Sequence, residues 1–163
     1  MCIQSRRRLL IARPTQEHRL SSLFHSVAIL AFIMAVPAFA LEDKFLDAGG
    51  VKICYIDTGK GEAIVLLHGG TSNLESWTSR GVVDNLARDF RVIAFDARGH
   101  GISSSPREPS AYGRQQALDV VRILDALKIN RAHIVGFSLG GSTVAQLLTL
   151  HPERFLTGVH LYH

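Results

Sequence analysis

The chain has 163 residues, 47% of them hydrophobic, which is enough for one domain with a substantial core. Five of the 18 basic residues and one of the 14 acidic residues lie in the first forty positions, so the remaining 123 residues carry 13 of each. Because the basic excess belongs to the N-terminus, this balance excludes a basic nucleic-acid-binding surface on the globular part, and we expect no nucleic-acid partner.

Residues 1–40 have the order of an export signal. A basic segment precedes the apolar run 27–36, which is followed by Pro37 and by a small-x-small cleavage site at 38–40. The apolar run has ten residues, whereas a helix that spans a membrane needs roughly 20. Cleavage after this site would make Leu41 the mature N-terminus. An uncleaved membrane anchor is the alternative.

We therefore expect an exported protein, periplasmic or secreted, with no stable membrane insertion once the signal is removed. Arginines at 6–8 resemble a twin-arginine signal, so both export routes stay open. Cys54 is the one cysteine beyond the signal, which precludes an intramolecular disulfide in the mature chain, and its place in a strand pattern predicts an inert core thiol. No Cys/His cluster has metal-ligand spacing, and we expect neither a metal nor another cofactor.

The rest of the chain alternates between strand and helix patterns. Residues 52–56 alternate as a half-buried strand that ends in a turn at 57–61. Residues 63–67 form a continuous apolar run, which is typical of a strand covered on both faces. A loop at 68–73 then leads to a helix that carries Trp77.

The second half repeats this alternation. Residues 91–95 form another buried strand, and a Ser/Pro-rich loop at 103–110 follows it. An amphipathic helix comes next, with apolar residues at helical spacing: Ala117, Val120, Val121, Leu124 and Leu127. A strand at 132–135, a helix at 142–150 and an apolar run at 155–161, which predicts a last strand, complete the chain.

Strands that alternate with helices of this length predict an α/β fold with a mainly parallel sheet and helices on both faces. Ligands of such sheets bind beyond the carboxyl ends of the strands. The loops at 68–73 and 96–103, and Ser138, all follow predicted strands. The sequence therefore predicts one site at this edge of the sheet.

The segment Gly-Phe-Ser-Leu-Gly-Gly at 136–141 carries the strongest functional signal. It has the pattern G-x-S-x-G between a predicted strand and a predicted helix, which is the pattern of a nucleophile elbow. In such a turn Gly136 and Gly140 leave room for a close backbone approach, and the Oγ of Ser138 is lifted into an active site. A serine that only caps the following helix is the alternative.

Two further loops accompany the elbow: His68, Gly69 and Gly70 after one strand, and Asp-Ala-Arg-Gly-His-Gly at 96–101 after the next. Together with the elbow, these loops resemble the α/β-hydrolase superfamily, in its single-domain branch of enol-lactonases, haloperoxidase-like esterases and carbon–carbon hydrolases. The resemblance covers residues 52–161. It implies that the partner is a small-molecule acyl substrate.

The resemblance also implies roles for individual residues. Ser138 would be the nucleophile that forms an acyl-enzyme. The backbone N–H of Leu139 would form half of the oxyanion hole, with the helix N-terminus behind it. Gly70 is the candidate for the second donor and Thr71 is the alternative. An ordinary strand-to-helix turn also explains the glycines at 69 and 70.

Asp96, Arg98 and His100 look catalytic by composition. In the family that the chain resembles, this loop mostly holds the sheet edge together by hydrogen bonds, and we expect that role here. Trp77 is expected in the core or in a pocket wall. Because Ser138 occupies the elbow, we do not expect the aspartate-nucleophile chemistry of dehalogenases or epoxide hydrolases.

The sequence departs from the family's pattern after the elbow. In the family the triad runs Ser, then Asp or Glu, then His, on loops after later strands. Here the last acidic residue is Glu153, at the end of the elbow helix, and His151 resembles a surface residue. His160 and His163 fall in the last predicted strand. None of these residues is expected to act as the base for Ser138.

We therefore divide the chain into an export signal at 1–40 and a partial α/β-hydrolase domain at 41–163. This domain ends in the strand after the elbow helix and lacks the cap, the triad acid and the triad histidine. Our leading hypothesis is the N-terminal part of an exported serine hydrolase for an ester, lactone or related acyl bond, truncated and inactive as it stands. A non-catalytic remnant that binds a ligand, and a split enzyme completed by another chain, are the alternatives.

Overall fold

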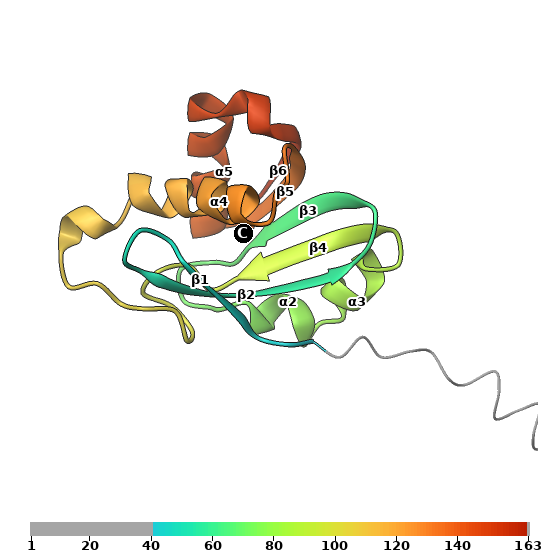
Figure 1. Cartoon of the computed structure of the whole chain (residues 1–163), viewed down its shortest axis with the longest axis horizontal. Coiled ribbons are helices and arrows are strands. Elements are labelled where there is room, and N and C mark those ends of the chain that lie inside the picture. Colours follow the sequence, from blue (N-terminus) through green and yellow to red (C-terminus); the bar gives the residue numbers. More distant parts are fainter. Residues whose placement is uncertain (1–40, 163) are drawn as a thin grey trace, which may run out of the picture. The chain divides into compact units, whose positions relative to one another are not determined.

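The structure is a computed structural model that describes residues 41–162 (Figure 1). The export signal predicted at 1–40 lies outside the described residues, as does His163. In chain order the elements are β1 (Lys44–Asp47), β2 (Lys52–Gly59), β3 (Glu62–Leu67), α2 (Glu75–Thr78), α3 (Val82–Leu86), β4 (Phe90–Phe95), the 3-10 turn η1 (Pro109–Ala111), α4 (Arg114–Ala126), β5 (Ala132–Phe137), α5 (Leu139–Leu150), the 3-10 turn η2 (Pro152–Arg154) and β6 (Phe155–Leu161).

Six strands form one sheet in the order β1-β2-β4-β3-β5-β6. The pairs β1–β2 and β2–β4 are antiparallel, whereas β4, β3, β5 and β6 run parallel to one another. The carboxyl ends of the parallel strands therefore share one edge, where the loops after β3 and β4 and the turn after β5 emerge. The predicted α/β fold with a mainly parallel sheet is confirmed.

Helices cover both faces of this sheet (Figure 1). In β3, Val65 and Leu67 belong to one apolar core, which includes buried residues of α4 and α5. Ile64 and Leu66 belong to a second core, which includes Val83 of α3. Alternate side chains of one strand thus enter two apolar cores, and this is why β3 is an uninterrupted apolar run in the sequence.

β2 continues to Gly59, through part of the turn predicted at 57–61. The carboxylate of Asp57 accepts two hydrogen bonds from the guanidinium of Arg91 in β4, at 2.9 and 2.7 Å. Gly59 also lies in register with Arg91. A bidentate pair between neighbouring strands keeps the chain extended, so the turn begins only after Gly59.

The helix predicted around Trp77 is two short helices. α2 ends at Thr78 and α3 begins at Val82, and between them Gly81 has a φ of 69°. Glycine adopts this left-handed conformation without the steric penalty of a Cβ, and a left-handed residue interrupts a right-handed helix. Strand β1 was not predicted, because its four residues are held by pairing with β2 rather than by a strong pattern of their own.

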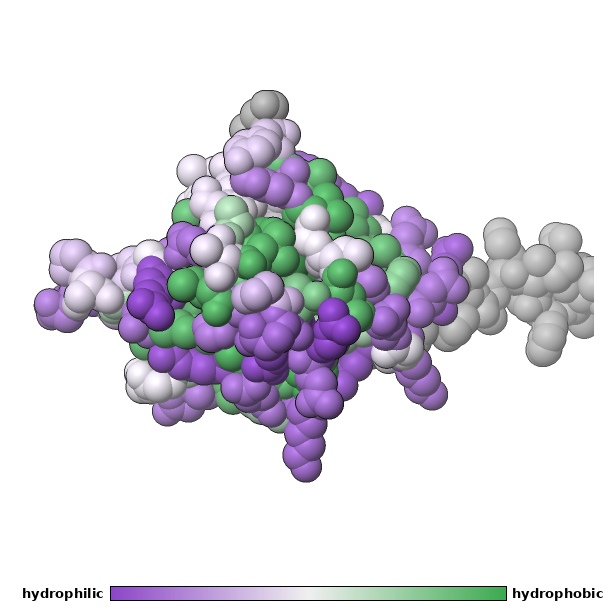
Figure 2. All heavy atoms as spheres, turned by 90° about the horizontal axis from the view of Figure 1, so that it is seen from above, coloured by the Kyte–Doolittle hydropathy of each residue, from purple (hydrophilic) through white to green (hydrophobic). Residues whose placement is uncertain are grey.

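β6 is one edge of the sheet as the structure describes it, and it pairs with β5. Its sequence, Phe-Leu-Thr-Gly-Val-His-Leu, has no acidic residue, lysine or arginine, and Val159 and Leu161 are 44% and 40% exposed. Figure 2 views the molecule from the side on which α5 and β6 lie in Figure 1, and apolar residues are clustered near the centre of this surface. An apolar edge strand without charges is a template for association with another chain.

We predict that Val159→Lys lowers the self-association of this chain. A lysine on an edge strand opposes strand pairing because its ammonium group must stay hydrated. Sedimentation velocity over a concentration series measures the oligomeric fraction, which should fall. Leu150→Lys replaces an apolar side chain of α5 with 40% exposure and serves as the matched control. An equal fall in both variants would contradict an effect specific to the edge.

Candidate active site

Ser138 occupies the turn between β5 and α5, alone between the last strand residue and the first helix residue. Its backbone has φ 51° and ψ −108°, a conformation that non-glycine residues rarely adopt and that costs about 1–3 kcal/mol. The residue is exposed to solvent. α5 begins at Leu139, earlier than the helix predicted from 142, so the serine sits directly on the helix N-terminus.

Close backbone contact explains the two glycines of the elbow. A Cβ at position 136 would overlap the backbone of Gly140, and a Cβ at position 140 would overlap the carbonyl oxygen of Leu67 in β3. The first turn of α5 thus lies directly against the ends of β5 and β3. Neither position 136 nor position 140 has room for a side chain.

Two backbone hydrogen bonds hold the strained turn. The N–H of Ser138 donates to the carbonyl of Leu161 in β6 at 3.0 Å, and the N–H of Ser142 donates to the carbonyl of Ser138 at 3.0 Å. The first bond ties the elbow to the neighbouring strand, and the second opens the helix. Together they hold the backbone of Ser138 in this conformation.

The structure brings the two predicted oxyanion-hole residues together. A Cβ built at Gly70 would lie 3.5 Å from both Cβ and Cδ2 of Leu139, so the loop after β3 touches the start of α5. Within residues 41–162, neither the N–H of Leu139 nor that of Gly70 has a hydrogen-bond acceptor. The positive end of the α5 dipole adds to the attraction for an anion at this point.

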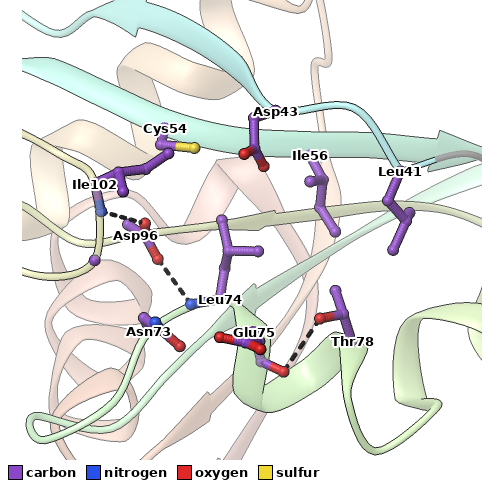
Figure 3. Close-up of a pocket in the computed structure, with 11 residues that line it drawn as sticks. Leu41, Asp43, Cys54, Ile56, Asn73, Leu74, Glu75, Thr78, Asp96 and Ile102 are labelled. Carbon is purple, nitrogen blue, oxygen red and sulfur yellow. Dashed lines mark hydrogen bonds between the residues drawn. The ribbon is translucent and has the colours of Figure 1, made fainter.

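The acidic and basic residues of the loop after β4 hold this edge of the sheet together, as predicted. Asp96 accepts hydrogen bonds from the N–H groups of Leu74 and Ile102, at 2.8 and 2.9 Å (Figure 3). The guanidinium of Arg98 donates two hydrogen bonds to the carboxylate of Asp119 in α4, at 2.7 and 2.5 Å. Arg98 also donates a hydrogen bond to the carbonyl oxygen of Ala111 at 2.6 Å, so these partners of both side chains are groups of the protein itself.

Asp119 is a residue that the sequence analysis missed. Its side chain is 1% exposed, and its carboxylate also accepts a hydrogen bond from Arg122 at 2.9 Å. Asp119 is next to Val120 in the predicted helix but is not one of the positions of its apolar stripe, so the sequence carried no clear signal of its burial. A buried carboxylate requires a cationic partner, and Arg98 is that partner here.

His68 is buried, and its hydrogen bonds require the neutral ring. Its Nε2 accepts the N–H of Ala97 at 3.0 Å, and its Nδ1 lies 2.7 Å from the carbonyl oxygen of Gly69. Burial lowers the pKa of His68 below its ordinary value, since the charged ring would lose its hydration. The ring therefore serves as a fixed donor and acceptor.

None of the histidines that the structure describes is hydrogen-bonded to the Oγ of Ser138. His133 contacts Thr157 and Glu62 at the far end of β5, and His151 contacts Glu153. The ring of His160 packs where a Cβ of Gly141 would lie, and its Nε2 is buried without a partner in residues 41–162.

Two cavities flank the loop after β3. One, of about 650 Å³, includes Trp77 and Phe137 in its wall, which is one of the two places predicted for Trp77. The other, of about 270 Å³, lies between β2 and α2 and is the pocket drawn in Figure 3. Its wall includes Cys54, whose burial raises the pKa of the thiol to about 11, as expected of an inert core thiol.

The described part of the chain offers no group of three His, Cys, Asp or Glu side chains that could hold a metal ion. Among residues 41–162 there is also no helix long and apolar enough to cross a membrane. Ser138 and Leu139 lie beside Gly70 at the carboxyl edge of the sheet.

Comparison with known proteins agrees with this geometry. Residues 62–161 match the sequence profile described as alpha/beta hydrolase fold, which is more than half of the chain. The chain belongs to the α/β-hydrolase fold family. The family resemblance and the fold predicted from the sequence are confirmed.

Relatives within this family include several hydrolases. The chain is 36% identical to the 2-hydroxy-6-oxo-6-(2'-aminophenyl)hexa-2,4-dienoic acid hydrolase of Metapseudomonas resinovorans, over 70% of this chain and 40% of that protein. It is 34% identical to a fluoroacetate dehalogenase of a Burkholderia species, over 71% and 39%. The enol-lactonase structure from Burkholderia xenovorans superimposes with a TM-score of 0.66 at 32% identity, over 71% and 45%. The chain spans less than half the length of these α/β-hydrolases.

We predict that Gly136→Ala lowers the free energy of unfolding by about 2 kcal/mol or more, because the new methyl group would overlap the Gly140 backbone. Urea denaturation followed by circular dichroism measures the change. Gly70→Ala is the matched control, since its methyl group would meet only the Leu139 side chain at an ordinary 3.5 Å. Equal losses in the two variants would refute the steric account of the elbow.

The lowered pKa of His68 predicts a pH dependence of stability. The unfolded chain binds a proton at this residue near the ordinary value of 6.5, whereas the folded chain binds it only at lower pH. The contribution of His68 is therefore complete above pH 6.5 and is lost as the pH falls below it.

Urea denaturation at about pH 7.5 and about pH 5 tests this dependence. His68→Gln keeps an acceptor for Ala97 but does not titrate, so the fall in unfolding free energy between the two conditions should be smaller than in the parent chain. His151→Gln, at a half-exposed position beside Glu153, is the control and should keep the parental fall. A parental fall in His68→Gln would show that His68 does not contribute.

Proposed function

We propose that this chain carries the nucleophile and oxyanion hole of a serine hydrolase that cleaves an ester, lactone or related acyl bond through an acyl-enzyme on Ser138. The observation that carries the proposal is the exposed, strained Ser138 at the N-terminus of α5, beside two backbone N–H groups that have no acceptor in residues 41–162. Strain at a single exposed residue is typical of a functional site.

In this mechanism the Oγ of Ser138 attacks the acyl carbon, and its proton passes to a general base. The carbonyl oxygen becomes an anion that accepts hydrogen bonds from the N–H of Leu139 and from the N–H of Gly70, or of Thr71 in its place. Collapse of this intermediate expels the leaving group and leaves an ester on Ser138. Water then cleaves that ester by the same sequence of steps.

The nucleophile favours acyl transfer over carbon–halogen or epoxide cleavage. One relative is named a dehalogenase, and displacement of a halide by an aspartate yields an ester that water can hydrolyse. The same displacement by Ser138 would yield an ether, which water does not cleave under these conditions. A catalytic cycle on Ser138 therefore requires an acyl substrate, and the enol-lactonase among the similar structures supports this choice.

We further propose that the triad acid and histidine lie outside the described residues. No described histidine contacts Ser138, and a serine without a base is a weak nucleophile. The chain alone should then hydrolyse p-nitrophenyl esters no faster than its Ser138→Ala variant. The absence of a described histidine in contact with Ser138 also fits the alternative, a non-catalytic protein that binds a ligand at this edge of the sheet. Export to the periplasm or medium remains part of the proposal.

A cysteine in place of Ser138 tests the elbow even when no general base is present, because the thiolate of cysteine is nucleophilic at neutral pH. For each cysteine variant we divide the rate of acylation by p-nitrophenyl acetate by the rate of alkylation by iodoacetamide. We predict that this ratio is about tenfold higher for Ser138→Cys than for Ser142→Cys. Alkylation forms no oxyanion, so the ratio reports stabilisation of the oxyanion rather than access to the thiol. Release of p-nitrophenolate and the mass of the modified chain measure the two reactions.

Ser142→Cys is the matched control, since residue 142 is exposed on the same helix one turn further along. The parent chain, with Cys2 and Cys54, supplies the background rate. Equal ratios at positions 138 and 142 would overturn the proposed function. A high ratio at 138 in a chain with no ester turnover would place the missing base outside the described residues.

A further inference from the structure

Two histidine rings hold successive carbonyl groups of the loop after β3. The Nδ1 of His68 lies 2.7 Å from the carbonyl oxygen of Gly69, and the Nε2 of His100 lies 2.7 Å from the carbonyl oxygen of Gly70. The two rings lie 5.2 Å apart, centroid to centroid. His100 comes from the loop after β4, so one loop braces the other.

The hydrogen-bond partners fix which ring nitrogens carry protons. Nε2 of His68 accepts the N–H of Ala97 at 3.0 Å, so the proton of the neutral ring is on Nδ1, where it reaches Gly69. A carbonyl oxygen can only accept, so the short contact between His100 and Gly70 requires a proton on Nε2. The Nδ1 of His100 lies 3.2 Å from the carbonyl of Arg98, a longer contact.

Holding a carbonyl also fixes the N–H of the same peptide unit. Peptide bonds are planar and trans, and no cis bond occurs in the described chain, so C=O and N–H point in opposite directions. The Gly69 carbonyl shares its peptide unit with the N–H of Gly70. The Gly70 carbonyl shares its unit with the N–H of Thr71. These two N–H groups are the two candidates for the second oxyanion donor.

We propose that His68 and His100 are positioning residues that set the direction of the second oxyanion donor by holding the peptide planes at Gly69 and Gly70, an inference that rests on the proposed function of Ser138. Neither ring touches the reacting atoms. Each acts through one carbonyl group of the loop.

The loop needs such a brace because of its composition. Two adjacent glycines allow many backbone conformations, and Gly70 and Thr71 are exposed to solvent. A peptide plane that rotates freely would point its N–H at the oxyanion for only part of the time. Oxyanion stabilisation depends on donors that are already in place when charge develops. The turn bond from the N–H of Ser72 to Gly69 restrains only the first of the two planes.

The experiment uses the thiol assay in the Ser138→Cys chain. We expect His100→Leu to lower the ratio of acylation to alkylation about tenfold, because the Gly70 plane loses its donor. His100→Gln places an amide N–H near the position of Nε2 and should restore the ratio to within about threefold of the parent. His133→Leu, at the other end of β5, is the control and should leave the ratio unchanged. An unchanged ratio in His100→Leu would overturn the proposal.

The failure of this inference is distinct from failure of the proposed function. If the elbow is not catalytic, the Ser138→Cys chain itself shows no acylation advantage over Ser142→Cys. If only the positioning role is wrong, that advantage persists in His100→Leu. Should His100→Leu not fold, long-range ¹⁵N–¹H correlation spectra of the unsubstituted chain decide the matter. Protons on Nδ1 of His68 and Nε2 of His100 would support the proposed hydrogen bonds to the Gly69 and Gly70 carbonyl groups. A proton on Nε2 of His68 would overturn the proposal.

Discussion

The contact between the first turn of α5 and the ends of β3 and β5 is the constraint on which the site depends. Gly140 lies against the carbonyl of Leu67, and Gly136 lies against the backbone of Gly140, so neither position has room for a side chain. Because the helix comes this close, a single residue must make the whole turn. That residue is Ser138, and its strained backbone is the consequence of the contact.

Buried polar side chains hold the surrounding loops to the sheet. Asp96 satisfies two backbone N–H groups, and Arg98 forms a buried bidentate pair with Asp119. In a low-dielectric interior each such group must find a partner. Leu74 and Asp119 lie in other segments of the chain, and Ile102 lies in the loop of Asp96 itself. The residues that look most catalytic by composition are thus the ones that fix the loops around the elbow.

Much of the fold follows from local patterns of apolar residues in the sequence. Residues 63–67 and 92–95 are continuous apolar runs because both faces of these strands are buried, and α4 shows its apolar stripe at helical spacing. The extension of β2 through Asp57 is different, since it depends on an ion pair with Arg91, 34 residues away in the chain.

The sequence by itself determined the family, the parallel sheet, the elbow and its two glycines, because these depend on residues that are adjacent in the chain. The tertiary structure decided what the polar residues do. His68 meets Ala97 across 29 residues, and His100 meets Gly70 across 30, so no local pattern could reveal that both rings hold the loop beside Leu139. Partners so distant in the chain are chosen by the packing of the sheet, which places the loops after β3 and β4 side by side.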